Sequence, residues 1–208
     1  MSTGVTTEGG FIDDIVHAYV TTLDTKVETS DKFSNYAPGH ARRVAEVAVS
    51  LAEAMMLDDE QVRIIKTGAL LHDIGEVILN QKFYHDPQEF SAAQMVDMWQ
   101  HSLVGEREVA RRGFGREEQL IVRWHHEWYN GNGYPDMLFG ADIPVSVRIV
   151  RLADSWDAIT HKRTWRRAYT KDESVQEVLI HAGSEFDPEI VLVFLDLLED
   201  GTIQYHQD

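Results

Sequence analysis

The sequence contains no cysteine, so disulfide bonds and thiolate metal sites are excluded. It also has no long apolar run: the longest, IVLVFL from Ile190, is much too short to span a bilayer. The first residues, MSTGVTTEGGF, have neither the basic region nor the apolar stretch of a signal peptide. These absences favour a cytoplasmic protein that does not enter a membrane.

Positive charge is scarce in this chain. Lys and Arg number 19 against 35 Asp and Glu, which gives a formal net charge of −16. Such a surface repels nucleic acid polymers and anionic membranes, so neither is an expected partner. The exception is residues 161–171, HKRTWRRAYTK, which carry cations and no acid. Charge alone leaves two interpretations open: a helix end whose cations complement the helix dipole, or a binding site for an anion.

Apolar residues recur at helical spacing almost throughout, and no segment alternates in the manner of a strand. The 208 residues, 43% of them hydrophobic, are enough for one large domain with a core. The sequence therefore predicts an all-α fold. We expect a flexible N-terminus over residues 1–10 and a single helical bundle over residues 11–208, with a metal site where helix ends converge.

Capping residues and periodicity place the individual helices. Asp58 with Gln61, and Thr170 with Glu173, have the spacing of capping boxes. Gly75 is expected to end the helix that Asp58 begins. The predicted helices cover about residues 11–26, 40–56, 59–74, 86–99, 101–112, 116–127, 144–161 and 188–199, and one more follows Thr170.

Half of the ten histidines fall at predicted helix ends: His40, His72, His101, His125 and His126. Adjacent helical residues point about 100° apart, so the last two cannot share one buried face. A lone histidine is usually structural, but helix ends can converge on a point while the helix bodies pack around it. The remaining histidines are expected at the surface or at helix ends: His17, His85, His161, His181 and His206.

Two aspartates complete a candidate metal site. Asp73 follows His72 in LLHDIGE, and its two oxygens could bridge two ions. Asp154 lies on the apolar face of a predicted helix, where a carboxylate is costly unless it is paired or bound to metal. Imidazole and carboxylate groups together suit iron, manganese, nickel or zinc. With Asp73 shared, the five histidines and two aspartates would supply four ligands to each of two ions.

Several segments occur in an order that resembles one known family: GHARRVAEVA, LLHDIG, HSLVGE, HHEWYNGNGYP, IPVSVRIVRLADSWDAIT, KRTWRR and FDPEIV. The chain is similar, from about residue 11 onward, to the HD-GYP domain, a branch of the HD phosphohydrolase superfamily. The resemblance implies a phosphodiesterase that opens cyclic di-GMP to the linear dinucleotide and on to GMP. It also implies two divalent metal ions, iron or manganese, as cofactors.

The resemblance assigns the metal ligands in two sets. One ion would be held by His40, His72, Asp73 and Asp154, and the other by Asp73, His101, His125 and His126. A water between the ions would lose a proton and attack phosphorus.

The resemblance also assigns residues around the substrate. Gly133 and Tyr134 of the GNGYP loop would form a wall of the site and bind substrate. Asp157, Arg163 and Arg166 match positions that contact the phosphates or the bridging water. Both arginines are expected to bind phosphate and to contribute little to folding. Asp73, Asp157 and Glu76 are the candidate catalytic residues.

The sequence departs from the family pattern at four places. Glu76 stands where the family has a lysine after HDIG, and Asp86–Pro87 stands in place of a later Lys-Pro. Asn130–Gly131 replaces Asp-Gly, and Tyr36 replaces a glutamate that binds a third metal in some members, so two metals are expected. Glu76 could weaken catalysis, change the substrate, bind metal, relay protons or simply pair at the surface.

Three functions therefore remain open: a cyclic-dinucleotide phosphodiesterase, a metal-dependent hydrolase of another phosphoester, and a non-catalytic module that binds a nucleotide or a protein. The complete ligand set argues for catalysis, and the lost lysine argues against it. Many family members carry a sensory or receiver domain, whereas only about ten residues precede the first predicted helix here. We therefore expect a stand-alone domain, regulated by a protein partner in trans or by expression.

Overall fold

The computed structural model describes residues 39–79, 92–162 and 166–205. Several sequence predictions fall outside these ranges: the helix over 11–26, the helix start at Asp86, and Tyr36, His17, His85, Arg163 and His206. The described residues form helices joined by turns and loops, without a strand longer than an isolated bridge. The predicted all-α fold is thus confirmed for this part of the chain. No helix in it is long and apolar enough to cross a membrane.

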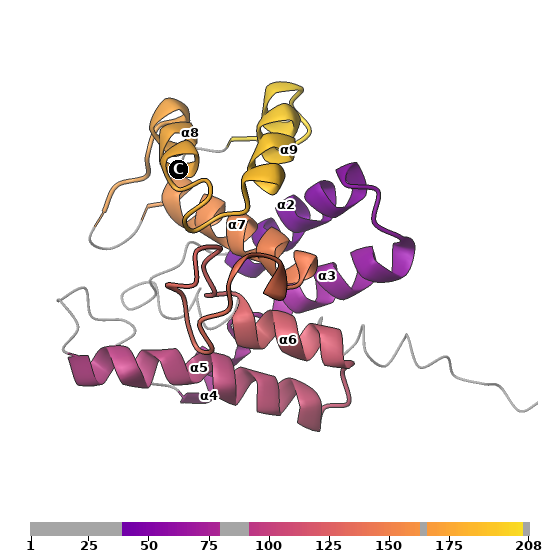
Figure 1. The fold of residues 1–208 in the computed structure, drawn as a ribbon, viewed down its shortest axis with the longest axis vertical. Coiled ribbons are helices and arrows are strands. Elements are labelled where there is room, and N and C mark those ends of the chain that lie inside the picture. Colours follow the sequence, from indigo (N-terminus) through magenta and orange to yellow (C-terminus); the bar gives the residue numbers. More distant parts are fainter. Residues whose placement is uncertain (1–38, 80–91, 163–165, 206–208) are drawn as a thin grey trace, which may run out of the picture.

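The described elements are helices and one 3₁₀ turn (Figure 1). Their bounds are α2 His40–Ala54, α3 Asp59–Leu71, α4 Ile74–Leu79, α5 Ala92–Arg111, α6 Arg116–Trp124, the 3₁₀ turn η2 Gly140–Asp142, α7 Val145–Thr160, α8 Lys171–Ile180 and α9 Pro188–Glu199.

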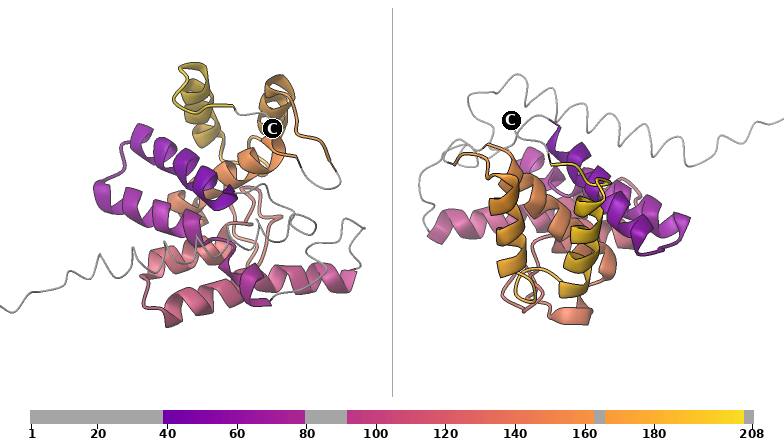
Figure 2. Two further views of the ribbon diagram at one scale, coloured as in Figure 1. Left: turned by 180° about the vertical axis from the view of Figure 1, so that it is seen from behind. Right: turned by 90° about the horizontal axis from the view of Figure 1, so that it is seen from above.

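Helix α7 occupies the centre of the bundle. It contacts α2, α3 and α6 on one side and α8 and α9 on the other, and Figures 1 and 2 show it between these two groups. Helices α2 and α3 form a hairpin, and α5 packs along α4 and α6. Because α7 is enclosed, its aliphatic residues and Trp156 join one hydrophobic core with side chains of α2, α3, α6 and α9. Buried carboxylates on α7 therefore lie inside the molecule.

The predicted helix caps are present. The Asp58 side chain accepts a hydrogen bond from Gln61 N at 2.8 Å, and Gln61 returns one to Asp58 N at 3.3 Å. Thr170 and Glu173 form the same reciprocal pair before α8. Asp187 caps α9 through Glu189 N at 2.9 Å. These caps satisfy amide groups that have no acceptor within the helix.

Three predicted boundaries are wrong. Helix α3 ends at Leu71, and Gly75 lies inside α4 rather than at a helix end. Glycine is needed there because a Cβ on Gly75 would lie 1.9 Å from the carbonyl oxygen of His101, so α4 could not approach α5. Helix α5 runs unbroken through the predicted gap near residue 100, and α6 stops at Trp124 instead of Glu127.

Candidate metal centre

The predicted metal ligands come from five parts of the fold. His40 begins α2, His72 follows α3, and His125 and His126 follow α6. His101 lies in the middle of α5, so the prediction that it starts a helix is wrong. Asp73 directly follows His72, and Asp154 lies in α7. All these side chains meet between the helices, and most are buried.

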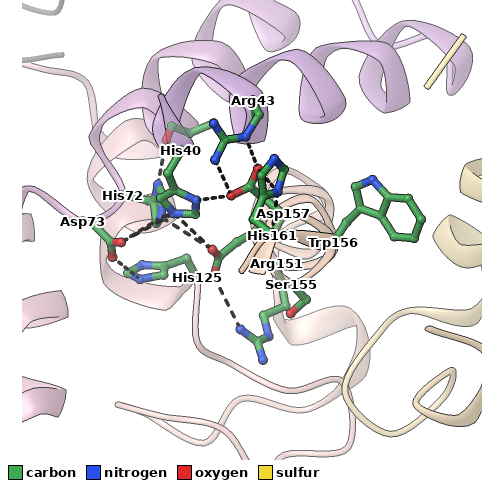
Figure 3. A network of polar contacts seen from close by, with 12 residues as sticks. His40, Arg43, His72, Asp73, His125, Arg151, Ser155, Trp156, Asp157 and His161 are labelled. Atoms are coloured by element: carbon green, nitrogen blue, oxygen red, sulfur yellow. Dashed lines mark hydrogen bonds and ion pairs between the residues drawn. The ribbon is translucent and has the colours of Figure 1, made fainter. Parts of the chain in front are cut away.

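The ligand atoms form two sets that share Asp73. Potential donor atoms of His40, His72 and Asp73 lie within 4.8 Å of one another, and so do those of Asp73, His101, His125 and His126. The two Asp73 oxygens divide between the sets (Figure 3): Oδ2 lies 3.2 Å from His72 Nε2, whereas Oδ1 lies 3.4 Å from His125 Nε2. This division would allow the Asp73 carboxylate to bridge two cations, with one oxygen directed at each.

Asp154 joins the first set from the opposite side. Its Oδ1 lies 3.4 Å from His40 Nε2 and 3.8 Å from His72 Nε2. His126 completes the second set, because its ring centroid is 4.0 Å from that of His125 and 5.0 Å from that of His101. The structure therefore brings together all seven residues that the sequence predicts as ligands.

The hydrogen bonds on the outer side of the cluster leave electron pairs pointing inward. His72 Nδ1 donates to the Ala69 carbonyl at 2.7 Å, and His125 Nδ1 donates to the Val122 carbonyl at 2.9 Å. His40 Nδ1 donates to Asp157 at 2.7 Å. When these rings are neutral, their Nε2 atoms carry lone pairs and face the cluster.

Acceptors thus face one another across short distances. His40 Nε2 and His72 Nε2 are 3.3 Å apart, and His101 Nε2 and His125 Nε2 are 3.2 Å apart. Asp73 Oδ2 is buried and accepts no hydrogen bond. A buried carboxylate oxygen without a donor is rare in proteins, and a bound cation would satisfy it. The donor set therefore fits bound metal.

The negative charge of the carboxylates in the cluster favours positively charged species, whether a proton on an imidazole or a metal ion. Although burial disfavours its protonated form, the carboxylates of Asp73 and Asp154 raise the pKa of His72 to about 10. Burial and the neighbouring His125, His101 and Arg151 hold the pKa of His126 well below its ordinary value, so this imidazole is neutral. A metal ion would compete with a proton for the His72 nitrogen, as is usual for histidine ligands.

Asp157 contacts the Nδ1 side of the His40 ring, which faces away from the ligand cluster. Besides the bond from His40 Nδ1, its carboxylate accepts hydrogen bonds from Arg43 Nε at 2.5 Å and Nη2 at 3.1 Å. Burial disfavours the charge, but the hydrogen bonds from His40 and Arg43 hold the pKa of Asp157 well below its ordinary value. In this placement Asp157 orients the candidate ligand His40, and the contact with phosphate or bridging water that the resemblance implies stays a prediction.

His161 is buried beside the same carboxylate. Its Nδ1 lies 3.3 Å from Asp157 Oδ1 and 3.0 Å from the Asp157 carbonyl oxygen. It follows the end of α7, as predicted for a helix-end residue, but it does not lie at the surface. Figure 3 shows His161, Asp157 and Arg43 grouped on one side of His40.

The GNGYP loop folds back over the second ligand set. The Tyr134 ring stacks on His126 with centroids 4.7 Å apart, and Trp99 of α5 stacks on Tyr134 at 5.2 Å. Gly133 is buried, and a Cβ there would lie 2.2 Å from Trp128 N. Gly133 thus allows the loop to approach the backbone and places Tyr134, and its predicted contact with substrate stays a prediction.

Glu127 holds this loop and was not predicted. Its carboxylate accepts hydrogen bonds from Asp136 N at 2.7 Å and Leu138 N at 3.0 Å. Burial is the main reason that the pKa of Glu127 is raised. Its position directly after the two histidines, in HHEWY, was the available sequence signal.

Glu76 lies in the first turn of α4 and is partly exposed. Burial chiefly raises the pKa of Tyr134, and the negative charges of Asp73, Glu76 and Asp154 add to this effect. The negative charge of Glu76 therefore acts in the same direction on the Tyr134 hydroxyl as those of Asp73 and Asp154, while Arg151 opposes them.

The basic stretch is largely engaged in folding. Arg166 donates to the carbonyl oxygens of Ala158 at 2.6 Å and Ile159 at 3.3 Å, near the end of α7. Arg166 thus caps carbonyls at the end of a helix, while its binding of phosphate and its small contribution to folding stay predictions. Arg167 pairs with Glu173 at 2.6 Å. Arg163 lies outside the described residues.

Arg151 is a second residue that sequence reasoning missed. Its Nη1 lies 3.5 Å from His126 Nδ1 and 3.8 Å from Asp154 Oδ2. Its Nη2 donates to the Glu185 carboxylate, and its Nε is buried without a hydrogen-bond partner. The sequence signal was weak: a cation three residues before Asp154 on an otherwise apolar helix face.

An all-helical bundle that brings five histidines and two aspartates together from helix ends, from α5 and from the central helix contains a candidate metal centre. Residues 32–190 match the family model described as HD domain. The chain belongs to the HD domain family, and the predicted relationship to HD-GYP proteins is confirmed.

Curated relatives include several cyclic-dinucleotide phosphodiesterases. The chain is 35% identical over 167 residues to the cyclic di-GMP phosphodiesterase response regulator RpfG of Xanthomonas campestris, which covers 79% of this chain and 43% of the relative. It is 33% identical over 160 residues to 3′3′-cGAMP-specific phosphodiesterase 2 of Vibrio cholerae, covering 76% and 30%. The chain thus spans less than half the length of these relatives.

Solved structures share the fold. A cyclic GMP-AMP-specific phosphodiesterase of V. cholerae, V-cGAP3, superposes with a TM-score of 0.70 at 19% identity, over 92% of this chain and 50% of that chain. Bd1817, an HD-GYP-type protein of Bdellovibrio bacteriovorus, gives 0.65 at 20% identity, over 91% and 63%.

Proposed function

We propose that this chain is a metal-dependent phosphodiesterase that hydrolyses a cyclic dinucleotide, with cyclic di-GMP as the expected substrate and linear dinucleotide or GMP as product. The observation that carries the proposal is Asp73, whose two oxygens face separate histidine pairs. The names of the curated relatives, which cite cyclic di-GMP and 3′3′-cGAMP, support the substrate class.

Two divalent ions fit the donor set. His40, His72, Asp73 and Asp154 would hold one, and Asp73, His101, His125 and His126 the other. Mixed imidazole and carboxylate ligands suit iron or manganese. When bound, such a pair supplies an activated water and neutralises charge on the phosphoryl oxygens.

The remaining residues have supporting roles. Asp157 and Arg43 fix the orientation of His40, so that its Nε2 stays directed at the cluster. Tyr134 and Trp99 provide aromatic rings beside His126, where a nucleobase of a bound dinucleotide could stack. This aromatic stack favours a nucleotide over a simple phosphoester.

Glu76 supports a second candidate, a non-catalytic module that binds a nucleotide. Its carboxylate near Tyr134 repels an approaching phosphate. Catalysis is favoured because the candidate ligands of both sets lie close together, whereas a binding module has no need for two such sets.

The test uses anaerobically purified protein loaded with iron(II) or manganese. It is incubated separately with cyclic di-GMP, 3′3′-cGAMP, cyclic di-AMP and bis(p-nitrophenyl) phosphate, and products are separated by chromatography. Linear dinucleotide or GMP from one of the cyclic dinucleotides is expected. Binding without turnover would support the non-catalytic module, and turnover of the nitrophenyl ester alone would support a hydrolase of other phosphoesters.

A further inference from the structure

Arg151 borders both ligand sets of the metal centre. On α7 it lies one turn before Asp154, so both side chains project from the same face of the helix. Its Nη1 is 3.8 Å from Asp154, a ligand of the first set, and 3.5 Å from His126, a ligand of the second. Asp73 belongs to both sets, but its side chain is negatively charged, whereas that of Arg151 is positively charged.

The guanidinium is held in place from its other side. Nη2 donates to the Glu185 carboxylate, and Ser155 Oγ donates to the same carboxylate at 3.2 Å. Only about 12% of the Arg151 side chain is exposed. A guanidinium fixed in this way is preorganised and loses little entropy when it binds a further group.

The other two nitrogen atoms of the Arg151 guanidinium, Nε and Nη1, lack short hydrogen bonds. Nε is buried and has no hydrogen-bond partner, and the two Nη1 contacts are longer than charge-assisted hydrogen bonds, which are usually 2.7–2.9 Å. A buried N–H without an acceptor carries an unfavourable desolvation free energy. Nη1, the donor that faces both ligand sets, could bind an oxygen of an anion there, because guanidinium donors suit phosphate.

We infer that Arg151 binds a non-bridging oxygen of the phosphodiester that is cleaved, and so acts as a catalytic residue. The inference rests on the proposed function. A phosphate that spans the two ligand sets must lie against groups that border both, and Arg151 is such a group with positive charge. It would offset the repulsion from Asp73, Asp154 and Glu76, and stabilise negative charge that develops on the phosphoryl oxygens.

A purely structural role is the competing explanation. The ion pair with Glu185 ties α7 to the turn after α8, and the Glu185 carbonyl accepts a hydrogen bond from Tyr129 N at 3.2 Å. If Arg151 serves only this connection, its replacement lowers the unfolding temperature but leaves phosphate binding unchanged.

The experiment compares four variants with the wild type: Arg151→Gln, Arg151→Lys, Glu185→Gln and Arg148→Gln. Arg148 is the matched control, because it lies one turn earlier on α7 and pairs with Asp187. Bound metal, unfolding temperature, kcat and KM are measured. Calorimetry gives the affinity of the metal-loaded protein for a phosphorothioate analogue of cyclic di-GMP.

Arg151→Gln is expected to weaken analogue binding about 10- to 100-fold at wild-type metal content, because a hydrogen bond to a charged group is lost. The analogue affinity of Arg148→Gln should stay within about twofold of that of the wild type. Glu185→Gln should mainly lower the unfolding temperature and change the analogue affinity less. Analogue affinity of Arg151→Gln equal to that of Arg148→Gln would overturn the inference.

If Arg151→Gln fails to fold, Arg151→Lys tests the inference in its place, since lysine keeps the positive charge but lacks the planar donors. At least threefold weaker binding supports the inference, and unchanged binding refutes it. Failure of the proposed function has a different signature, because the wild type would then leave every cyclic dinucleotide intact. The Arg151-dependence of analogue binding can still be measured in that case.

Discussion

Asp73 is the residue on which the two ligand sets depend, because one oxygen faces His72 and the other faces His125. Asp73→Ala should therefore reduce bound metal by more than half, which metal analysis of protein loaded with excess manganese would show. Asp196→Ala is the control, since Asp196 is exposed on α9. Wild-type metal content in the Asp73 variant would contradict a shared carboxylate.

Glu76 places negative charge near the position expected for the phosphate. Glu76→Lys should tighten binding of cyclic di-GMP by roughly 1 kcal/mol, because the charge changes by two units at a partly exposed position. It should also raise turnover. Glu76→Gln should give about half of this effect. Kinetics and metal analysis are performed on both variants. Reduced turnover together with lost metal would show instead that Glu76 is a ligand or a proton relay.

At the scale of elements, helix α7 joins the site to α2 through one carboxylate. Asp157 receives hydrogen bonds from His40 and Arg43, which lie one turn apart on α2. Asp157→Asn should lower metal affinity about 10-fold, because outer partners orient histidine ligands. A metal titration measures this, with Asp172→Asn, on exposed α8 surface, as the control. Equal affinities for the two variants would mean that His40 needs no partner.

Helix α5 brings Trp99 against the GNGYP loop, and about 38% of this tryptophan remains exposed. Trp99→Ala should raise KM for a cyclic dinucleotide about 10-fold, because stacking contributes about 1–3 kcal/mol per base. KM for bis(p-nitrophenyl) phosphate should not change, since that ester lacks a nucleobase, and Trp99→Phe should retain most of the affinity. An equal increase for both substrates would mean that Trp99 only supports the loop.

At the scale of the whole molecule, the ligands come from α2, α3, α5, α7 and the turn after α6, so bound metal would cross-link the bundle. Chelation should lower the unfolding temperature. At free metal of about 100 times Kd, each site adds about 2.7 kcal/mol to the free energy of unfolding. Calorimetry with and without manganese measures this, and Asp73→Ala should show a smaller shift. An unchanged unfolding temperature in the wild type would exclude metal binding to the folded chain.

The sequence by itself determined the helical fold, the capping boxes at Asp58 and Thr170, and which seven residues to expect as metal ligands. These features depend on local periodicity, on residue types suited to caps, and on motifs in a specific order. Helix boundaries near Gly75 and Trp99 were predicted wrongly. The close contact between Gly75 and His101, and the packing of α5, involve neighbours that local sequence does not show.

Only the tertiary structure decided what surrounds the ligands. Asp157 orients His40 although 117 positions separate them in the chain, and Arg151 meets His126 across 25. Trp99 of α5 contacts Tyr134, which lies in the GNGYP loop after α6. Such contacts depend on how helices pack, because side-chain periodicity says which face is buried but not which distant residue it meets. The seven candidate ligands were therefore readable from the sequence, and the residues that contact them from other parts of the fold were not.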